Sequence, residues 1–271
     1  MTSNDLQNSP SGEQAPDAGA PDPTEKPFVA HLVELRDRLL RALACVFAVL
    51  LALMPFSNPL YSGLSEPLIA VMPGDGTMIA TQVASPFLAP FKLTVFVAVL
   101  ISAPFIFYQA WAFVAPGLYL HERRLALPLM VSSTVLFYLG NAFAYFVVFP
   151  LVFGFFTAIA PAGVTIMTDI THYLDFVLML FLAFGAAFEV PVATYLLVRT
   201  GLTTVDALAK KRPFIIVGAF AIGMLLTPPD VISQTLLALP MWLLYEIGLL
   251  LCRWTIPLDE NGRPARDREE A

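Results

Sequence analysis

The sequence LTVFVAVLISAPFIFYQAWAF occupies residues 93–113 and contains no charged side chain. A helix needs about 20 apolar residues to cross the roughly 30 Å hydrocarbon core of a bilayer, so this stretch is long enough to span a membrane. The rest of the chain has the same character, because 58% of its residues are hydrophobic and only 13% are charged. Soluble domains contain about 25% charged residues. The sequence therefore predicts an all-α integral membrane protein.

Five further apolar runs are predicted to be membrane helices. Three are comparable in length to the first and cover 39–56, 129–149 and 176–198. Two are short, because 214–226 has thirteen residues and 236–245 has ten. At 1.5 Å per residue these two would cover only about 20 Å and 15 Å, so the bilayer is expected to thin around them. We expect six transmembrane helices, with two short C-terminal spans and a concave outline. Kinks are predicted by the prolines at 104, 128, 150, 191 and 240.

The basic residues indicate how these helices are oriented. Of the fifteen Lys and Arg residues, all but Lys92 fall in the two terminal segments or in alternate gaps between the apolar runs. Cytoplasmic segments are enriched in Lys and Arg, which predicts both termini in the cytoplasm of a bacterial inner membrane. The predicted organisation is a disordered cytoplasmic tail over 1–26, a six-helix membrane domain over 27–254 and a cytoplasmic tail over 255–271.

The sequence offers little for catalysis. Its three histidines are isolated, and the His-Glu pair at 121–122 lacks the second histidine of a zinc-protease motif. Its two cysteines imply no disulfide or metal framework, and no glycine-rich phosphate loop is present. We therefore predict that the protein is not an enzyme, with no metal or cofactor and no nucleic-acid partner.

Two acidic residues lie among the basic residues of the predicted cytoplasmic side. Glu34 belongs to HLVELRDRLLR at 31–41, and Glu122 belongs to LHERR at 120–124. In one interpretation each acid only neutralises nearby arginines, in exposed ion pairs worth about 0–1 kcal/mol. In the other, both acids bind a cationic ligand through charged hydrogen bonds worth about 1.5–3 kcal/mol each. Composition alone does not choose between them.

Glu189 lies deep in the predicted span 176–198, where a charge costs about 2.5–3.5 kcal/mol on insertion scales. Pro191 lacks an N–H, which leaves a carbonyl one turn away without its helical hydrogen bond. Glu189 is therefore either a hydrogen-bonded acid without a mechanistic role, or part of an intramembrane polar groove for a ligand, a partner helix or a proton. At the outer ends of the short helices, Thr227 and Gln234 could bind a partner helix or cap their own helices.

Several extended strings follow one another along the predicted spans. They are HLVELRDRLL (31–40), SPFLAPFKL (85–93), YQAWAFVAPGLYLHERR (108–124), FYLGNAFAYFVVFP (137–150), FGAAFEVPVA (184–193), KKRPF (210–214) and GMLLTPPDVISQTLLALP (223–240). In this order they resemble the TatC family of twin-arginine translocase subunits, over about residues 27–254. One departure is Leu120, where some members have Lys.

The resemblance implies a receptor for folded precursor proteins whose signal peptide carries two consecutive arginines. In the family, the acid of the first-helix motif and the acid of the first cytoplasmic loop bind this signal. These acids map onto Glu34 and Glu122, and the resemblance implies that the site is shaped by Arg36, Arg123 and Arg124.

The resemblance also implies association with the single-span subunits TatB and TatA, and self-association is expected. The partner helices would bind along the short helices, near Met224, Thr227 and Gln234. The proton-motive force, rather than a nucleotide, would supply the energy.

Two other functions remain open from the residues alone. A proton-coupled transporter of small solutes would use Glu189 and needs several polar groups converging on it. A purely structural scaffold would not need Glu34 or Glu122.

Overall fold

The computed structural model describes residues 25–71, 78–114, 126–159, 167–227 and 230–256, and every regular element in these ranges is helical. In chain order the elements are α1 (Glu25–Leu53), a 3₁₀ turn (Met54–Phe56), α2 (Ser57–Val71), α3 (Ser85–Val114), α4 (Ala126–Phe143), a π-helical turn (Ala144–Val148), α5 (Phe149–Ile159), α6 (Ile170–Phe188), α7 (Val190–Arg199), α8 (Val205–Lys210), α9 (Arg212–Leu226) and α10 (Val231–Thr255).

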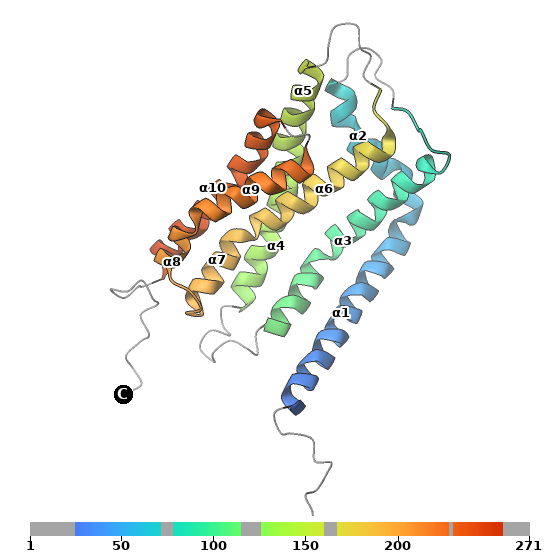
Figure 1. The fold of residues 1–271 in the computed structure, drawn as a ribbon. Coiled ribbons are helices and arrows are strands. Elements are labelled where there is room, and N and C mark those ends of the chain that lie inside the picture. Colours follow the sequence, from blue (N-terminus) through green and yellow to red (C-terminus); the bar gives the residue numbers. More distant parts are fainter. Residues whose placement is uncertain (1–24, 72–77, 115–125, 160–166, 228–229, 257–271) are drawn as a thin grey trace, which may run out of the picture.

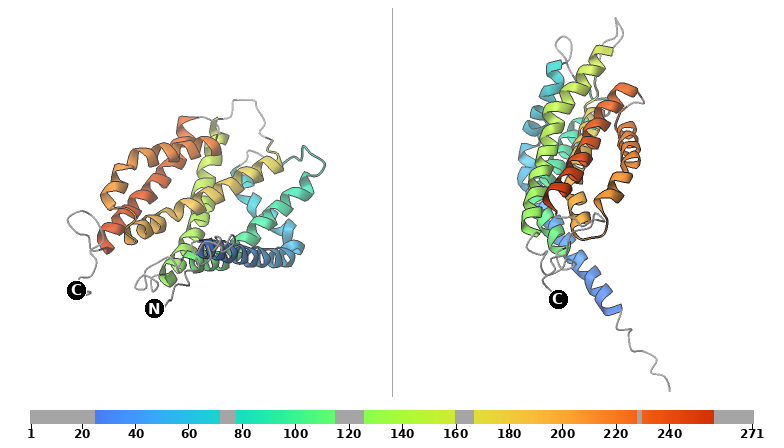
Figure 2. Two further views of the ribbon diagram at one scale, coloured as in Figure 1. Left: turned by 60° about the horizontal axis from the view of Figure 1, so that its bottom comes forward. Right: turned by 90° about the vertical axis from the view of Figure 1, so that its left-hand side faces the viewer.

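The predicted all-α membrane class is confirmed. Within the described ranges, five helical stretches are long and apolar enough to cross a membrane: His31–Glu66, Ser85–Phe113, Leu127–Ile159, Ile170–Arg199 and Val231–Thr255. A sixth apolar helix, Arg212–Leu226, is shorter. α6 and α7 run through the middle of the molecule, with α1 and α3 on one side and α9 and α10 on the other (Figures 1 and 2). The predicted concave outline stays a prediction.

Prolines account for two distortions of the long spans. Phe149 donates its backbone N–H to the carbonyl of Ala144, one residue farther back than in an α-helix. The wider turn precedes Pro150, whose ring would clash with a carbonyl in a regular α-helix. The second distortion is at Glu189, where α6 ends and α7 begins, with Pro191 in the first turn of α7. Pro104 and Pro240, by contrast, lie inside continuous helices.

The prediction of a second short span is wrong. α9 is short, with 15 residues, but α10 has 25. The apolar run appeared to stop at Glu246, yet the helix continues past it. The charge of Glu246 is neutralised by Arg212 of α9, whose Nε donates to Oε1 at 2.5 Å. At the other end, Asp230 accepts from the backbone N–H of Ser233 at 2.8 Å and caps the helix. Polar groups with partners allow α10 to extend beyond its apolar run.

The largest core cluster is centred on α6, against which α5 and the π-helical turn pack, and it includes further buried residues of α2, α3, α9 and α10. Its fully buried side chains include Phe149, Leu180 and Phe184. The helices approach closely at Gly140, where an added Cβ would lie 2.7 Å from the carbonyl oxygen of Phe184. Only glycine permits this distance between α4 and α6.

We expect Gly140→Ala to destabilise the protein by about 1–3 kcal/mol, because the added methyl group must push two packed helices apart. Thermal unfolding in detergent, followed by circular dichroism, measures the effect. Gly154→Ala is the matched control, because an added Cβ there meets nothing within 4 Å and alanine favours a helix. Equal midpoints for the two variants would show that the α4–α6 contact is adaptable.

A cluster of hydrogen bonds joins two segments on the side opposite the predicted cytoplasmic face. Asp169 Oδ2 accepts from the Thr81 hydroxyl at 2.6 Å and from the Thr81 backbone N–H at 2.9 Å. These hydrogen bonds hold the pKa of the Asp169 carboxyl well below its usual range. The backbone N–H of Ile79 also donates to Thr168, at 3.0 Å. The cluster therefore fastens the segment before α3 to the start of α6.

Candidate functional site

Glu34 lies on the N-terminal part of α1, in a network with Arg38 and Gln109. Arg38 Nε and Nη2 donate to Glu34 Oε1 at 2.9 and 2.6 Å, and Arg38 Nη1 approaches Gln109 Oε1 on α3 at 3.5 Å. The Glu34 side chain is 37% exposed, whereas Gln109 is buried. Glu34 Oε2 has no donor among the described residues, so this carboxylate can accept further hydrogen bonds from outside.

An open hollow of about 380 Å³ lies beside this network, lined by Val33, Glu34, Asp37, Arg38 and Arg41. It exposes carboxylates as well as guanidinium groups. The predicted site residue Arg36 does not contact Glu34, because it donates to Asp37 Oδ1 from Nε at 3.0 Å and from Nη2 at 2.7 Å.

The other three predicted signal-binding residues, Glu122, Arg123 and Arg124, lie outside the described residues. The chain that leads to them is nevertheless placed. His31 stacks on Phe113 near the end of α3, with ring centroids 4.2 Å apart. Because α3 ends at Val114, the end of α3 lies beside the turn of α1 that carries Glu34.

Arg38 and Gln109 were not among the predicted site residues. The spacing of Glu34 and Arg38 is i, i+4, a pair that faces one another on a helix, so the pattern contained a signal for Arg38. No local pattern indicates Gln109, which is 71 residues from Arg38.

Glu189 lies at the junction of α6 and α7. Its backbone N–H donates to the carbonyl of Ala186 at 3.1 Å, and the hydroxyl of Ser133 on α4 faces its carboxyl group. Glu189 Oε1 is buried and has no hydrogen-bond partner among the described residues. The structure thus places an incompletely satisfied acid within a span, next to a break in the helix.

The predicted partner-contact residues differ in what they offer. Met224 is 59% exposed. The Thr227 hydroxyl donates to Gly223 O of its own helix at 3.0 Å, and Gln234 Nε2 donates to Phe220 O on α9 at 3.0 Å. Thr227 therefore caps α9, and Gln234 holds α10 against α9.

A metal site is not evident in the described part of the chain, which contains no cluster of three or more His, Cys, Asp or Glu residues able to hold an ion.

Comparisons with known proteins agree with one another. The family model described as Sec-independent protein translocase protein (TatC) matches residues 30–240. The Sec-independent protein translocase protein TatC of Haemophilus influenzae is 62% identical over 237 residues, covering 88% of this chain and 93% of that protein. The protein of the same name from Escherichia coli K12 is 56% identical over 236 residues, covering 87% and 92%. The crystal structure of a twin-arginine translocase receptor, TatC, has a TM-score of 0.74 and 36% identity, over 83% of this chain and 98% of that one.

Proposed function

Because the chain belongs to the TatC family and is a receptor subunit of the twin-arginine translocase, not an enzyme, we propose that Glu34 and Glu122 hold the paired arginines of a signal peptide. The observation that carries the proposal is the half-exposed carboxylate of Glu34, which has an unused oxygen beside an open hollow. An arginine side chain presents several N–H donors in a planar fork that matches a carboxylate.

The hydrogen bonds around Glu34 support a binding site that is preorganised in the absence of the signal peptide. Arg38 binds one carboxylate oxygen and is itself close to Gln109, which fixes the position of Glu34 on α1. An acid held in place loses little side-chain entropy when it binds. Arg36, Arg123 and Arg124 are proposed to shape the site around the two acids.

Crosslinking tests the location of this site. A photoreactive residue at Val33, which lines the hollow, should link to a twin-arginine peptide but not to a peptide with two lysines in place of the arginines. Val83 is the control position, because it is fully exposed on the opposite side. Equal linkage from Val33 and Val83 would contradict the assignment.

We further propose the topology and partners of this multi-pass membrane protein. Both termini lie in the cytoplasm, with terminal tails over 1–26 and 255–271 around a membrane domain over 27–254. Single-span TatA and TatB helices bind beside α9 and α10, where the exposed side chain of Met224 offers an apolar contact. The membrane is the inner membrane of a bacterium, and the complex contains more than one copy of the chain.

We expect the short length of α9 to matter for transport. At 1.5 Å per residue its 15 residues cover only about 22 Å, so the bilayer must thin there. One added turn of Leu and Ala inside α9 should reduce export of a folded precursor more than it reduces the amount of protein in the membrane. Export at the parental rate with normal insertion would show that the thin region is incidental.

A further inference from the structure

α9 and α10 touch near both ends of α9. At one end, Gly223 approaches Gln234 so closely that an added Cβ would lie 3.2 Å from Gln234 Cγ. At the other end, Arg212 forms an ion pair with Glu246, with Nη2 2.8 Å from Oε2. These two contacts fix the separation of the helices over the turns between them.

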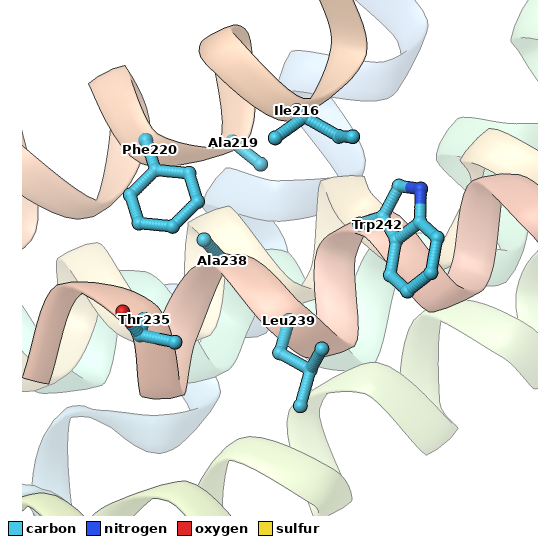
Figure 3. Close-up of a pocket in the computed structure, with 7 residues that line it drawn as sticks. All are labelled: Ile216, Ala219, Phe220, Thr235, Ala238, Leu239 and Trp242. Carbon is cyan, nitrogen blue, oxygen red and sulfur yellow. The ribbon is translucent and has the colours of Figure 1, made fainter. Parts of the chain in front are cut away.

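An apolar hollow of about 150 Å³ separates the helices between these contacts (Figure 3). It exists because the facing residues, Ala219 and Ala238, are small, while Phe220 and Trp242 flank them. The hollow is open on one side, and the surface that it exposes is apolar. In a bilayer it is therefore suited to a short stretch of hydrocarbon rather than to water.

The end of α9 and α10 nearest Arg212 and Glu246 is basic. Lys211 and Arg253 are exposed there and take part in no ion pair within the described residues, whereas Glu246 is already neutralised by Arg212. Trp242 and Arg253 are eleven residues apart on α10, which places them within about 20° of one another around the helix. The hollow and the surplus positive charge therefore lie along one side of α10.

We propose that this groove binds an anionic phospholipid, with one acyl chain in the α9–α10 hollow and the phosphate against Lys211 and Arg253. Basic pockets between membrane helices are suited to such headgroups. The hollow begins at Ile216, four residues or about 6 Å along α9 from Arg212, so hydrocarbon and headgroup lie in the correct order.

The lipid comes from the cytoplasmic leaflet, which rests on the proposed topology. The groove is separate from the proposed signal site, because that site is built on α1 and α3. Lipid binding and signal binding can therefore be measured and lost independently.

Fluorescence quenching tests the groove. The chain has three tryptophans, and replacing Trp111 and Trp254 by Phe leaves Trp242 as the reporter. In nanodiscs, phosphatidylglycerol with brominated acyl chains should quench Trp242 more strongly than phosphatidylcholine with the same chains at the same mole fraction. Lys211→Gln and Arg253→Gln should each weaken phosphatidylglycerol binding about fivefold. Arg41→Gln, on α1, is the matched control and should leave quenching unchanged.

A second arm tests the hollow itself. Ala238→Leu fills it and should lower quenching by both lipids, whereas Ala221→Leu, on an exposed position of α9, should not. Equal quenching by the two lipids, or quenching insensitive to both Lys211 and Arg253, would overturn the proposal. In nanodiscs that contain the purified protein alone, linkage from a photoreactive residue at Leu239 to a second copy of the chain, rather than to lipid, would also overturn it.

Discussion

A variant with alanine at both Glu34 and Glu122 is expected to lose most of its affinity for a twin-arginine signal peptide. Each acid contributes charged hydrogen bonds worth about 1.5–3 kcal/mol, so each single substitution should weaken binding by about 10- to 150-fold. Titration of a fluorescent signal peptide with the purified protein measures the loss. High salt should weaken binding to the parental protein and narrow its difference from the variants, because exposed charges are screened.

Matched substitutions separate charge from shape. Glutamine at either position keeps an acceptor but removes the charge, so its effect should lie between those of the parental protein and alanine. Glu122→Lys should be worse than alanine, because it adds repulsion of the arginines. Glu66→Ala removes an exposed acid from α2 and should leave binding unchanged. Parental affinity in both single alanine variants would show that these acids are not the receptor site.

The second large effect is expected at Glu189. Alanine there removes the carboxyl group that faces Ser133 and leaves a void beside the α6–α7 break. Glutamine keeps the size and the hydrogen-bonding ability but carries no titratable proton. If Glu189 offers a hydrogen-bonding position in a groove, Glu189→Gln should retain substantial export and Glu189→Ala should fall at least about fivefold lower.

Both Glu189 variants must be compared at equal abundance in the membrane, with export of a folded precursor as the readout. If Glu189→Gln loses export as completely as Glu189→Ala does, while both variants still bind the signal peptide, a proton relay at this position is favoured. The Glu189→Gln variant therefore tests whether export requires the titratable proton of Glu189 or only its hydrogen-bonding ability.

Much of the fold could be predicted because a membrane helix is encoded in a continuous run of sequence. The long spans were predicted in this way and are confirmed. The family was predicted from the resemblance of the extended strings, and it is confirmed as well. The length of α10 was not predicted, because the partner of Glu246 is Arg212, 34 residues earlier. Gln109 was not predicted for the same reason, because its partner Arg38 is 71 residues away in the sequence. Pairs that form across helices leave no local pattern, and they determine where a polar residue is tolerated.

The candidate site was predictable only in part. Glu34 could be predicted as a site residue because it is an acid among several arginines of the sequence. Its partner Arg38 lies one turn later on the same helix. Arg36, which the resemblance places at the site, forms an ion pair with Asp37 and does not contact Glu34, since side chains two residues apart on a helix do not face one another. The roles of Glu34, Glu122 and Glu189 remain predictions.

The bond between Asp169 and Thr81 has a consequence for the order of events during synthesis. The two residues are 88 positions apart, and ribosomes add about 5–20 residues per second. The Asp169 carboxylate, which accepts the hydrogen bonds of Thr81, is therefore synthesised roughly 4–18 s after Thr81. During that interval α3, α4 and α5 are made, but the segment before α3 is not yet fastened to α6. The early helices can therefore still adjust, and the synthesis of Asp169 marks the earliest moment at which the segment before α3 can be joined to α6.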